Sequence, residues 1–161
     1  MNKIKRIVLV MGVLLACFAV SAQNGRSIGA IFDEYGKREG SIMIELGKDV
    51  LGSRTQIKRY KSLMIPSDTA MIRLTKEAIA KDIKEGRKLF ESRKDGKIES
   101  ISYSLKKEEQ TSEYEYILFS DKSRKMTLIY VRGNFPPERL ESELRRLKDL
   151  FIKVNNKQLK L

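Results

Sequence analysis

Apolar and polar side chains alternate along much of residues 88–119, and a period of two residues leaves little but β-structure open to this stretch. Ile101, Tyr103 and Leu105 share one face of such a strand, with serines between them on the other face. The dipeptide Asp95-Gly96 favours a tight hairpin turn, because both residues adopt positive φ at little cost. Residues 126–131 are apolar on both faces, so they predict a strand in the middle of the sheet. Together these segments predict a four-strand antiparallel meander, with strands over residues 88–93, 98–105, 114–119 and 126–131.

Three other segments have apolar residues at the spacing of a helix that buries one face. The first helix begins at Ile28. The second follows Asp68 or Ser67, either of which can cap it. The third begins at Pro137, whose missing N–H costs nothing at a helix start. The last helix has an apolar stripe for packing on the sheet, formed by Leu140, Leu144, Leu147 and Phe151. Short strands are expected over residues 41–46 and 63–65.

These elements predict a single α+β domain over residues 23–161, whose last part, residues 153–161, is a basic tail. Its antiparallel sheet would consist of the four-strand meander plus one or two short strands. The helices would pack mainly on one face of that sheet, because each has only one apolar face.

The first 22 residues have the pattern of an export signal. Lys3, Lys5 and Arg6 precede an uncharged apolar run that is shorter than a bilayer-spanning helix, so we expect no transmembrane helix after processing. Small residues before Gln23 predict cleavage between Ala22 and Gln23. Alternatively, Leu14-Leu15-Ala16-Cys17 resembles a lipobox, in which Cys17 would be lipidated and would tether the domain to a membrane.

The remainder after residue 22 contains no Cys, no His and no Trp. This excludes a disulfide, a zinc site of Cys and His ligands, and nucleophilic catalysis by Ser-His-Asp or Cys-His groups. Loss of the three basic leader residues lowers the net charge from +12 to +9. We expect no cofactor and no metal, and long-range attraction to anionic partners.

The densest group of positive charge consists of Arg54, Lys58, Arg59 and Lys61. In an extended segment Arg59 and Lys61 share a face, with Lys58 opposite, whereas in a helix Arg54, Lys58 and Lys61 align. The cluster is a candidate contact for an anionic surface. The other interpretation is an edge strand whose charges prevent aggregation.

Tyr103, Tyr114 and Tyr116 form a candidate aromatic face in the meander. Such rings could stack on a sugar or a peptide, or they could simply pack across strands. A nucleic acid partner is not expected of an exported protein.

Glu113 and Glu115 could be a carboxylate pair on one strand, but their spacing alone does not make a hydrolase. No Ser-x-x-Lys stands at a helix start. These carboxylates leave a carboxylate-dependent hydrolase as the weakest of the functions considered.

Four features follow one another along the chain: a leader ending in Ala22-Gln23, a helix with Ile31-Phe32-Asp33-Glu34-Tyr35, the hairpin at Asp95-Gly96, and a last strand that leads into Gly133-Asn134-Phe135. This order resembles the small exported domains of unknown function that are common in Bacteroidetes. The resemblance implies a fold class and a location, and no catalytic or ligand residue.

Taken together, the sequence predicts an exported, non-enzymatic binding or interaction domain of the periplasm or cell envelope. Its partner would be an envelope protein or an anionic surface. The main alternative is a binder of anionic envelope material, lipid headgroups or acidic glycan, through the basic cluster. The oligomeric state cannot be read from the sequence.

Overall fold

The computed structural model describes residues 25–158, with side chains up to residue 150. The expected leader, with the cleavage site Ala22-Gln23 and Cys17, lies outside the described residues. Among the described residues, no helix has both the length and the apolar character needed to cross a membrane.

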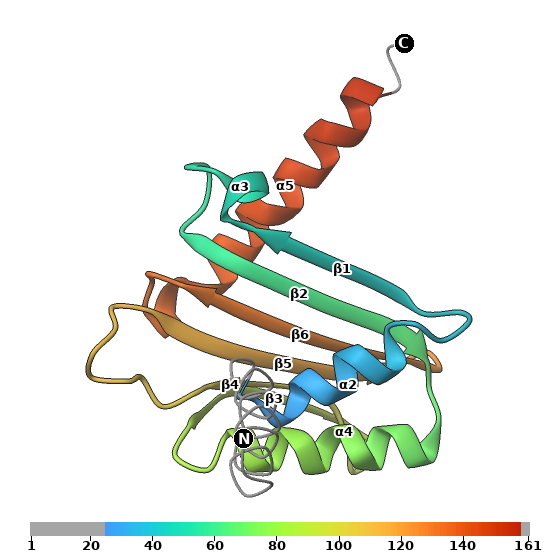
Figure 1. The fold of residues 1–161 in the computed structure, drawn as a ribbon. Helices are drawn as coiled ribbons and strands as arrows, with labels where there is room; N and C mark the ends of the chain where they lie inside the picture. Colours follow the sequence, from blue (N-terminus) through green and yellow to red (C-terminus); the bar gives the residue numbers. More distant parts are fainter. Residues whose placement is uncertain (1–24, 159–161) are drawn as a thin grey trace, which may run out of the picture.

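A six-stranded antiparallel sheet forms the centre of the molecule, with the strand order β1-β2-β6-β5-β4-β3 (Figure 1). This confirms the α+β class and the antiparallel meander. The strands are β1 (Ile42–Gly47), β2 (Ile57–Pro66), β3 (Arg87–Lys94), β4 (Lys97–Ser104), β5 (Tyr114–Lys122) and β6 (Lys125–Gly133). The apolar strand β6 lies between β2 and β5, in the middle of the sheet, as its two apolar faces predict.

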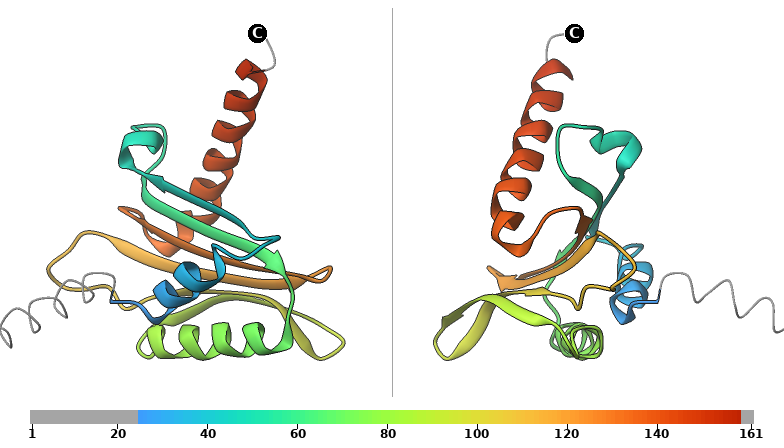
Figure 2. Two further views of the ribbon diagram at one scale, coloured as in Figure 1. Left: turned by 45° about the vertical axis from the view of Figure 1, so that its right-hand side comes forward. Right: turned by 90° about the vertical axis from the view of Figure 1, so that its left-hand side faces the viewer.

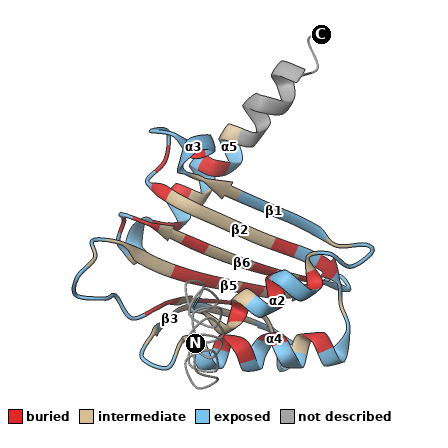
Figure 3. Ribbon diagram, in the orientation of Figure 1, coloured by how far each residue is buried: buried red, intermediate tan, exposed pale blue. Residues whose placement is uncertain are grey.

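Helices α2 (Ser27–Tyr35) and α4 (Thr69–Asp82) cover one face of the sheet, which we call the helical face (Figure 2). The main core lies beneath them. It joins Ile28, Phe32, Met71 and Ile79 of the helices to Leu63, Ile117, Phe119, Met126 and Leu128 of the sheet. Figure 3 shows this buried centre in red, with exposed residues along the outer strand and the loops.

The closing helix α5 (Leu140–Gln158) lies across one end of the opposite face, which we call the open face. A 3₁₀ turn, η2 (Pro137–Arg139), leads into it. A second, smaller core joins this helix and the short helix α3 (Lys48–Leu51) to the sheet. It contains Leu51, Ile57, Tyr116, Val131, Phe135, Leu140 and Leu147. Leu140, Leu144 and Leu147 of the stripe predicted for the last helix thus pack on the sheet, on the face opposite α2 and α4. The fourth residue of that stripe, Phe151, lies outside the residues whose side chains are described.

Two carboxylates fix the ends of the helices on the helical face. Asp68 accepts a hydrogen bond from the Met71 N–H at 3.0 Å, which confirms it as the cap of α4. Helix α2 has no capping side chain of its own. Asp82, from the last turn of α4, accepts from the Ser27 and Ile28 N–H groups at 2.7 and 2.9 Å. One helix therefore holds the start of the other over the sheet.

The basic segment is part of strand β2, which begins at Ile57 and not at Leu63 as expected. It is not an edge strand, because β2 pairs with β1 on one side and with β6 on the other. The edge-strand interpretation of its charges is therefore wrong. At the other end of the chain, α5 continues to Gln158, so the expected basic tail is helical through that residue.

Candidate functional site

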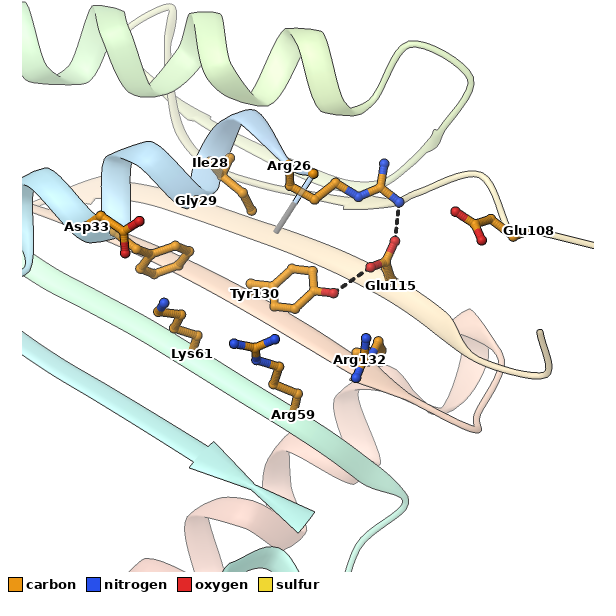
Figure 4. Close-up of a pocket in the computed structure, with 12 residues that line it drawn as sticks. Arg26, Ile28, Gly29, Asp33, Arg59, Lys61, Glu108, Glu115, Tyr130 and Arg132 are labelled. Carbon is orange, nitrogen blue, oxygen red and sulfur yellow. Dashed lines mark hydrogen bonds and ion pairs between the residues drawn. The ribbon is translucent and has the colours of Figure 1, made fainter. Parts of the chain in front are cut away.

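A cavity of about 370 Å³ lies between the start of α2 and the helical face of the sheet (Figure 4). Helix α2 and the residues before it supply one wall, including Arg26, Phe32 and Asp33. Strands β2, β6 and β5 supply the floor, and Glu108 comes from the loop between β4 and β5. A smaller cavity of about 150 Å³ adjoins it and shares Glu108, Glu115 and Arg132.

Three cations from two neighbouring strands face this cavity: Arg59 and Lys61 on β2, and Arg132 on β6. Arg59 and Lys61 share a face because they are two residues apart on a strand. Arg132 joins them because antiparallel pairing places it opposite Arg59. Glu45 on β1 lies 2.9 Å from Arg59 and 3.4 Å from Lys61, so it offsets part of their charge.

The donors of these cations are only partly used. Glu45 accepts one hydrogen bond from Arg59, which has five N–H groups in all. Arg132 Nε lies 3.1 Å from a Glu113 oxygen, but it is buried and has no hydrogen-bond partner among the described residues. The Lys61 ammonium lies 5.2 Å from the centre of the Phe32 ring, within range of a cation–π contact. The other N–H groups of Arg59 therefore remain for a further anionic group, whereas the buried Nε of Arg132 is not accessible to one.

An ordered network closes the other side of the cavity. Glu115 forms an ion pair with Arg26 and accepts a hydrogen bond from the Tyr130 hydroxyl at 2.5 Å. Burial raises the pKa of Tyr130 well above its ordinary value, and the bond to Glu115 acts in the same direction. Tyr130 is thus a neutral donor that positions the Glu115 carboxylate. These contacts join α2, β5 and β6 around the cavity.

Residues 15–144 match a family of unknown function, DUF6108. The chain belongs to this family. No curated protein matches it. The family confirms the expected domain-of-unknown-function type, whereas a Bacteroidetes source stays a prediction.

The DUF6108 match includes every strand and the whole cavity, and it ends within α5. Among residues 25–158, no group of three or more His, Cys, Asp or Glu side chains is arranged to hold a metal ion. The cavity of this DUF6108 domain is lined by four cations and by the three carboxylates of Asp33, Glu108 and Glu115, beside a phenol and an aromatic ring. Its cationic side, formed by Arg59, Lys61 and Arg132, suits an organic anion.

The structure divides the predicted basic cluster of the DUF6108 domain. Arg59 and Lys61 face the cavity, as the extended alternative predicts. Lys58 lies at an irregularity in the β2–β6 pairing and donates to Glu113 at 2.8 Å. Arg54 is exposed in the loop before β2 and does not line the cavity.

The three tyrosines of the predicted aromatic face are not brought together. Tyr103 pairs with Ile117 and packs against the core under α2 and α4. Tyr114 and Tyr116 lie on the open face, stacked with centroids 6.5 Å apart. Tyr116 is fully buried, and its hydroxyl donates to the Phe135 carbonyl at 2.5 Å, so its role is packing.

The sequence alone does not identify Arg26, Tyr130 or Arg132 as site residues. The period of two on β6 places Tyr130 and Arg132 on one face, which is a readable signal. Their approach to Arg59 and Lys61 depends on β2 pairing with β6, and no local pattern encodes that pairing.

Glu113 and Glu45 accept hydrogen bonds from Lys58 and Arg59, and these bonds should make the stability of the DUF6108 domain sensitive to acid. The hydrogen bond from Lys58 lowers the pKa of Glu113, and the hydrogen bond from Arg59 lowers the pKa of Glu45, both from an ordinary value of 4.5. A lowered folded-state pKa contributes stability that is complete above the ordinary value and is lost as the pH falls below it. We therefore expect the unfolding temperature to drop as the pH falls below about 4.5.

The variant Glu113→Gln should remove part of this slope, as measured by thermal unfolding followed by circular dichroism at a series of pH values. Glu141→Gln is a suitable control, because Glu141 is 87 % exposed and, among the residues whose side chains are described, forms an ion pair only with Arg145 on its own helix. A Glu113→Gln profile that coincides with the wild-type profile would show that the Lys58 bond contributes nothing to acid sensitivity.

Proposed function

We propose that this chain is an exported, non-enzymatic binding domain of the cell envelope that holds an anionic group of its ligand in the cavity beneath α2. The observation that carries the proposal is the convergence of Arg59, Lys61 and Arg132 on one cavity. The anionic group would be a phosphate or a carboxylate, since both accept paired N–H donors from guanidinium groups. The predicted leader over residues 1–22 supports the location.

The wall of the cavity supports a ligand with an apolar or ring-shaped part beside its anionic group. Ile28 and Phe32 line the cavity from α2, and Tyr130 lines it from β6. A pocket of this size accommodates a small organic molecule or the head of a larger one. This proposal narrows the alternative of a binder of anionic envelope material through the basic cluster, because Arg59 and Lys61 of that cluster line a concave site.

Binding is favoured over hydrolysis by the state of the two carboxylates once considered catalytic. A hydrolase of that kind needs one protonated acid beside one ionised group. The pKa of Glu113 is instead lowered by Lys58, and Glu115 accepts from Arg26 and Tyr130. Both carboxylates act as ion-pair partners that shape the cavity.

The test compares two triple variants that remove equal charge. The first changes the cavity cations, Arg59→Ser, Lys61→Ser and Arg132→Ser. The second changes exposed cations that do not line the cavity, Arg54→Ser, Lys97→Ser and Arg124→Ser. Binding is measured by co-sedimentation with phosphatidylglycerol vesicles and by calorimetry with free glycerol phosphate and with polygalacturonate, each at graded salt. Phosphatidylcholine vesicles serve as the neutral control.

We expect the cavity variant to bind at least about tenfold more weakly, because charge-assisted bonds contribute roughly 1.5–3 kcal/mol each. The matched surface variant should stay within about twofold. The probe that binds identifies the source of the anion. Equal losses in the two variants would mean that net charge alone attracts the anion, and the cavity would then have no role.

A further inference from the structure

The two edge strands of the sheet differ in how they are protected. The edge strand β3 carries Arg87, Lys88, Arg93 and Lys94, and its pairing with β4 is interrupted by two irregularities. Charges and bulges of this kind prevent an edge from pairing with another chain. The other edge strand, β1, has one charged residue, Glu45, and pairs with β2 without interruption over all six residues. Of the two sheet edges that the described residues form, β1 is therefore the one open to further pairing.

Strand β1 also exposes apolar side chains beside this edge. On the open face, Ile42 is 59 % exposed, and Ile44 and the neighbouring Met64 of β2 are exposed as well. Figure 3 shows most of β1 in the colour of exposed residues. An apolar edge with exposed backbone groups is a surface at which proteins associate.

Helix α5 extends beyond the same edge. Its 19 residues span about 28 Å. The residues that pack on the open face, Leu140, Leu144 and Leu147, belong to its first half. From there the helix continues past β1, on the side of the open face (Figures 1 and 2). A sheet that continued beyond β1 would lie beneath this part of α5.

We propose that β1 pairs antiparallel with β1 of a second copy of this chain, which joins two six-stranded sheets into one. A two-fold axis through an antiparallel pair is perpendicular to the sheet, so the open faces of both copies lie on the same side. Helix α5 of each copy then lies over the open face of the other. Each copy covers apolar surface that the other leaves exposed.

The register follows from charge. A two-fold axis places one residue opposite itself, and near the middle of β1 that residue is Ile44 or Glu45. Glu45 opposite Glu45 would bring like charges together, which is destabilising. With Ile44 at the axis, Ile42 lies opposite the second copy's Leu46, and Met43 lies opposite the second copy's Glu45. This register forms a continuous apolar row on the open face.

A second copy fits this surface better than an extended peptide does. A peptide would satisfy the backbone of β1 but would add a single strand. It would leave the far part of α5 without a sheet beneath it. A second copy supplies both a strand of matching length and an apolar face for the helix, and it does so twice because the contact is symmetric.

Sedimentation equilibrium over a broad range of concentration tests the proposal. The wild type should have twice the mass of the chain. The variant Ile44→Lys, which places two lysines opposite each other at the axis, should be monomeric with an unchanged circular dichroism spectrum. Phe90→Lys is the matched control, because Phe90 is 57 % exposed on the opposite edge strand, and this variant should stay dimeric. A wild type that is monomeric throughout, with or without affinity for extended peptides, overturns the proposal.

Disulfide cross-linking tests the register without relying on the fold of the lysine variant. In a Cys17→Ser background the chain has no other Cys. Residues opposite each other across an antiparallel pair lie within the Cα separation that a disulfide accepts. Ile44→Cys should therefore cross-link on oxidation, whereas Glu45→Cys and Phe90→Cys should not. Equal cross-linking of all three variants, or none at Ile44→Cys, contradicts the proposed pairing.

Discussion

Replacement of Glu143 by alanine is expected to lower the free energy of unfolding by about 2–4 kcal/mol. The Glu143 side chain is fully buried. One of its oxygens accepts from the Thr55 hydroxyl and from the Gln56 N–H, both at 2.9 Å. The other accepts from Arg146 at 3.1 Å and from Arg139 at 3.4 Å. Removal of the carboxylate leaves the buried Thr55 hydroxyl and the partly buried Gln56 N–H without this acceptor, while the two arginines are exposed enough to regain water.

Urea unfolding followed by circular dichroism measures this loss. Glu141→Ala is the control two residues away, because the Glu141–Arg145 pair is exposed and should change stability by less than about 0.5 kcal/mol. Glu143→Gln should fall between the two, because an amide oxygen can still accept from the Gln56 N–H. A Glu143→Ala variant as stable as the Glu141→Ala variant would mean that Glu143 does not anchor α5.

The antiparallel meander was predictable because each of its signals is local. The turn at Asp95-Gly96 has both residues at positive φ, 51° and 76°, as the dipeptide predicts. The alternation from Ile101 to Leu105 places apolar residues toward the core under α2 and α4. The cap at Asp68 is equally local, since the carboxylate bonds an N–H three residues ahead. Such features depend on neighbours in the sequence, so periodicity and turn chemistry suffice to find them.

The candidate site was only half predictable, because it depends on contacts between distant segments. Arg59 and Lys61 were identified as sharing a face, but their meeting with Arg132 requires β2 to pair with β6 across the intervening helix and hairpins. The capping of α2 by Asp82 and the burial of Glu143 are likewise tertiary. In the sequence, Asp82 and Glu143 look like acids on the solvent-facing side of a helix. Charged residues are buried only where a specific set of donors converges, and the sequence does not display that set.

The second core also explains why the last residue of β6 is a glycine. The sequence predicts a strand that stops at residue 131, whereas Gly133 is the last residue of β6 and pairs with Ile57 on one side and Tyr114 on the other. A Cβ at this position would press against the Gln56 carbonyl oxygen and would lie 2.5 Å from Cε1 of the Phe135 ring. Glycine is required here for close approach, since the φ angle itself is not positive.

We expect Gly133→Ala to lower the free energy of unfolding by about 2–3 kcal/mol, because one of the two clashes is with backbone and the other is with a buried ring. Phe135 is fully buried and stacks on Tyr116 with centroids 5.3 Å apart, so its ring has little room to move. Urea unfolding measures the loss. Gly96→Asn is the control, because nothing lies within 4 Å of a Cβ there and asparagine tolerates the positive φ.

The position of the substitution adds a functional readout to this prediction. Gln56 immediately precedes β2, so displacement of its carbonyl would shift the start of the strand that carries Arg59. Gly133→Ala should therefore weaken anion binding at the cavity as well as stability, even under conditions where the variant is fully folded. Gly96→Asn, at the tip of the β3–β4 hairpin, should change neither. A Gly133→Ala variant that unfolds like the wild type would show that the Phe135 ring and the Gln56 carbonyl yield without cost. The second core would then not fix the geometry of β2 or of the cavity.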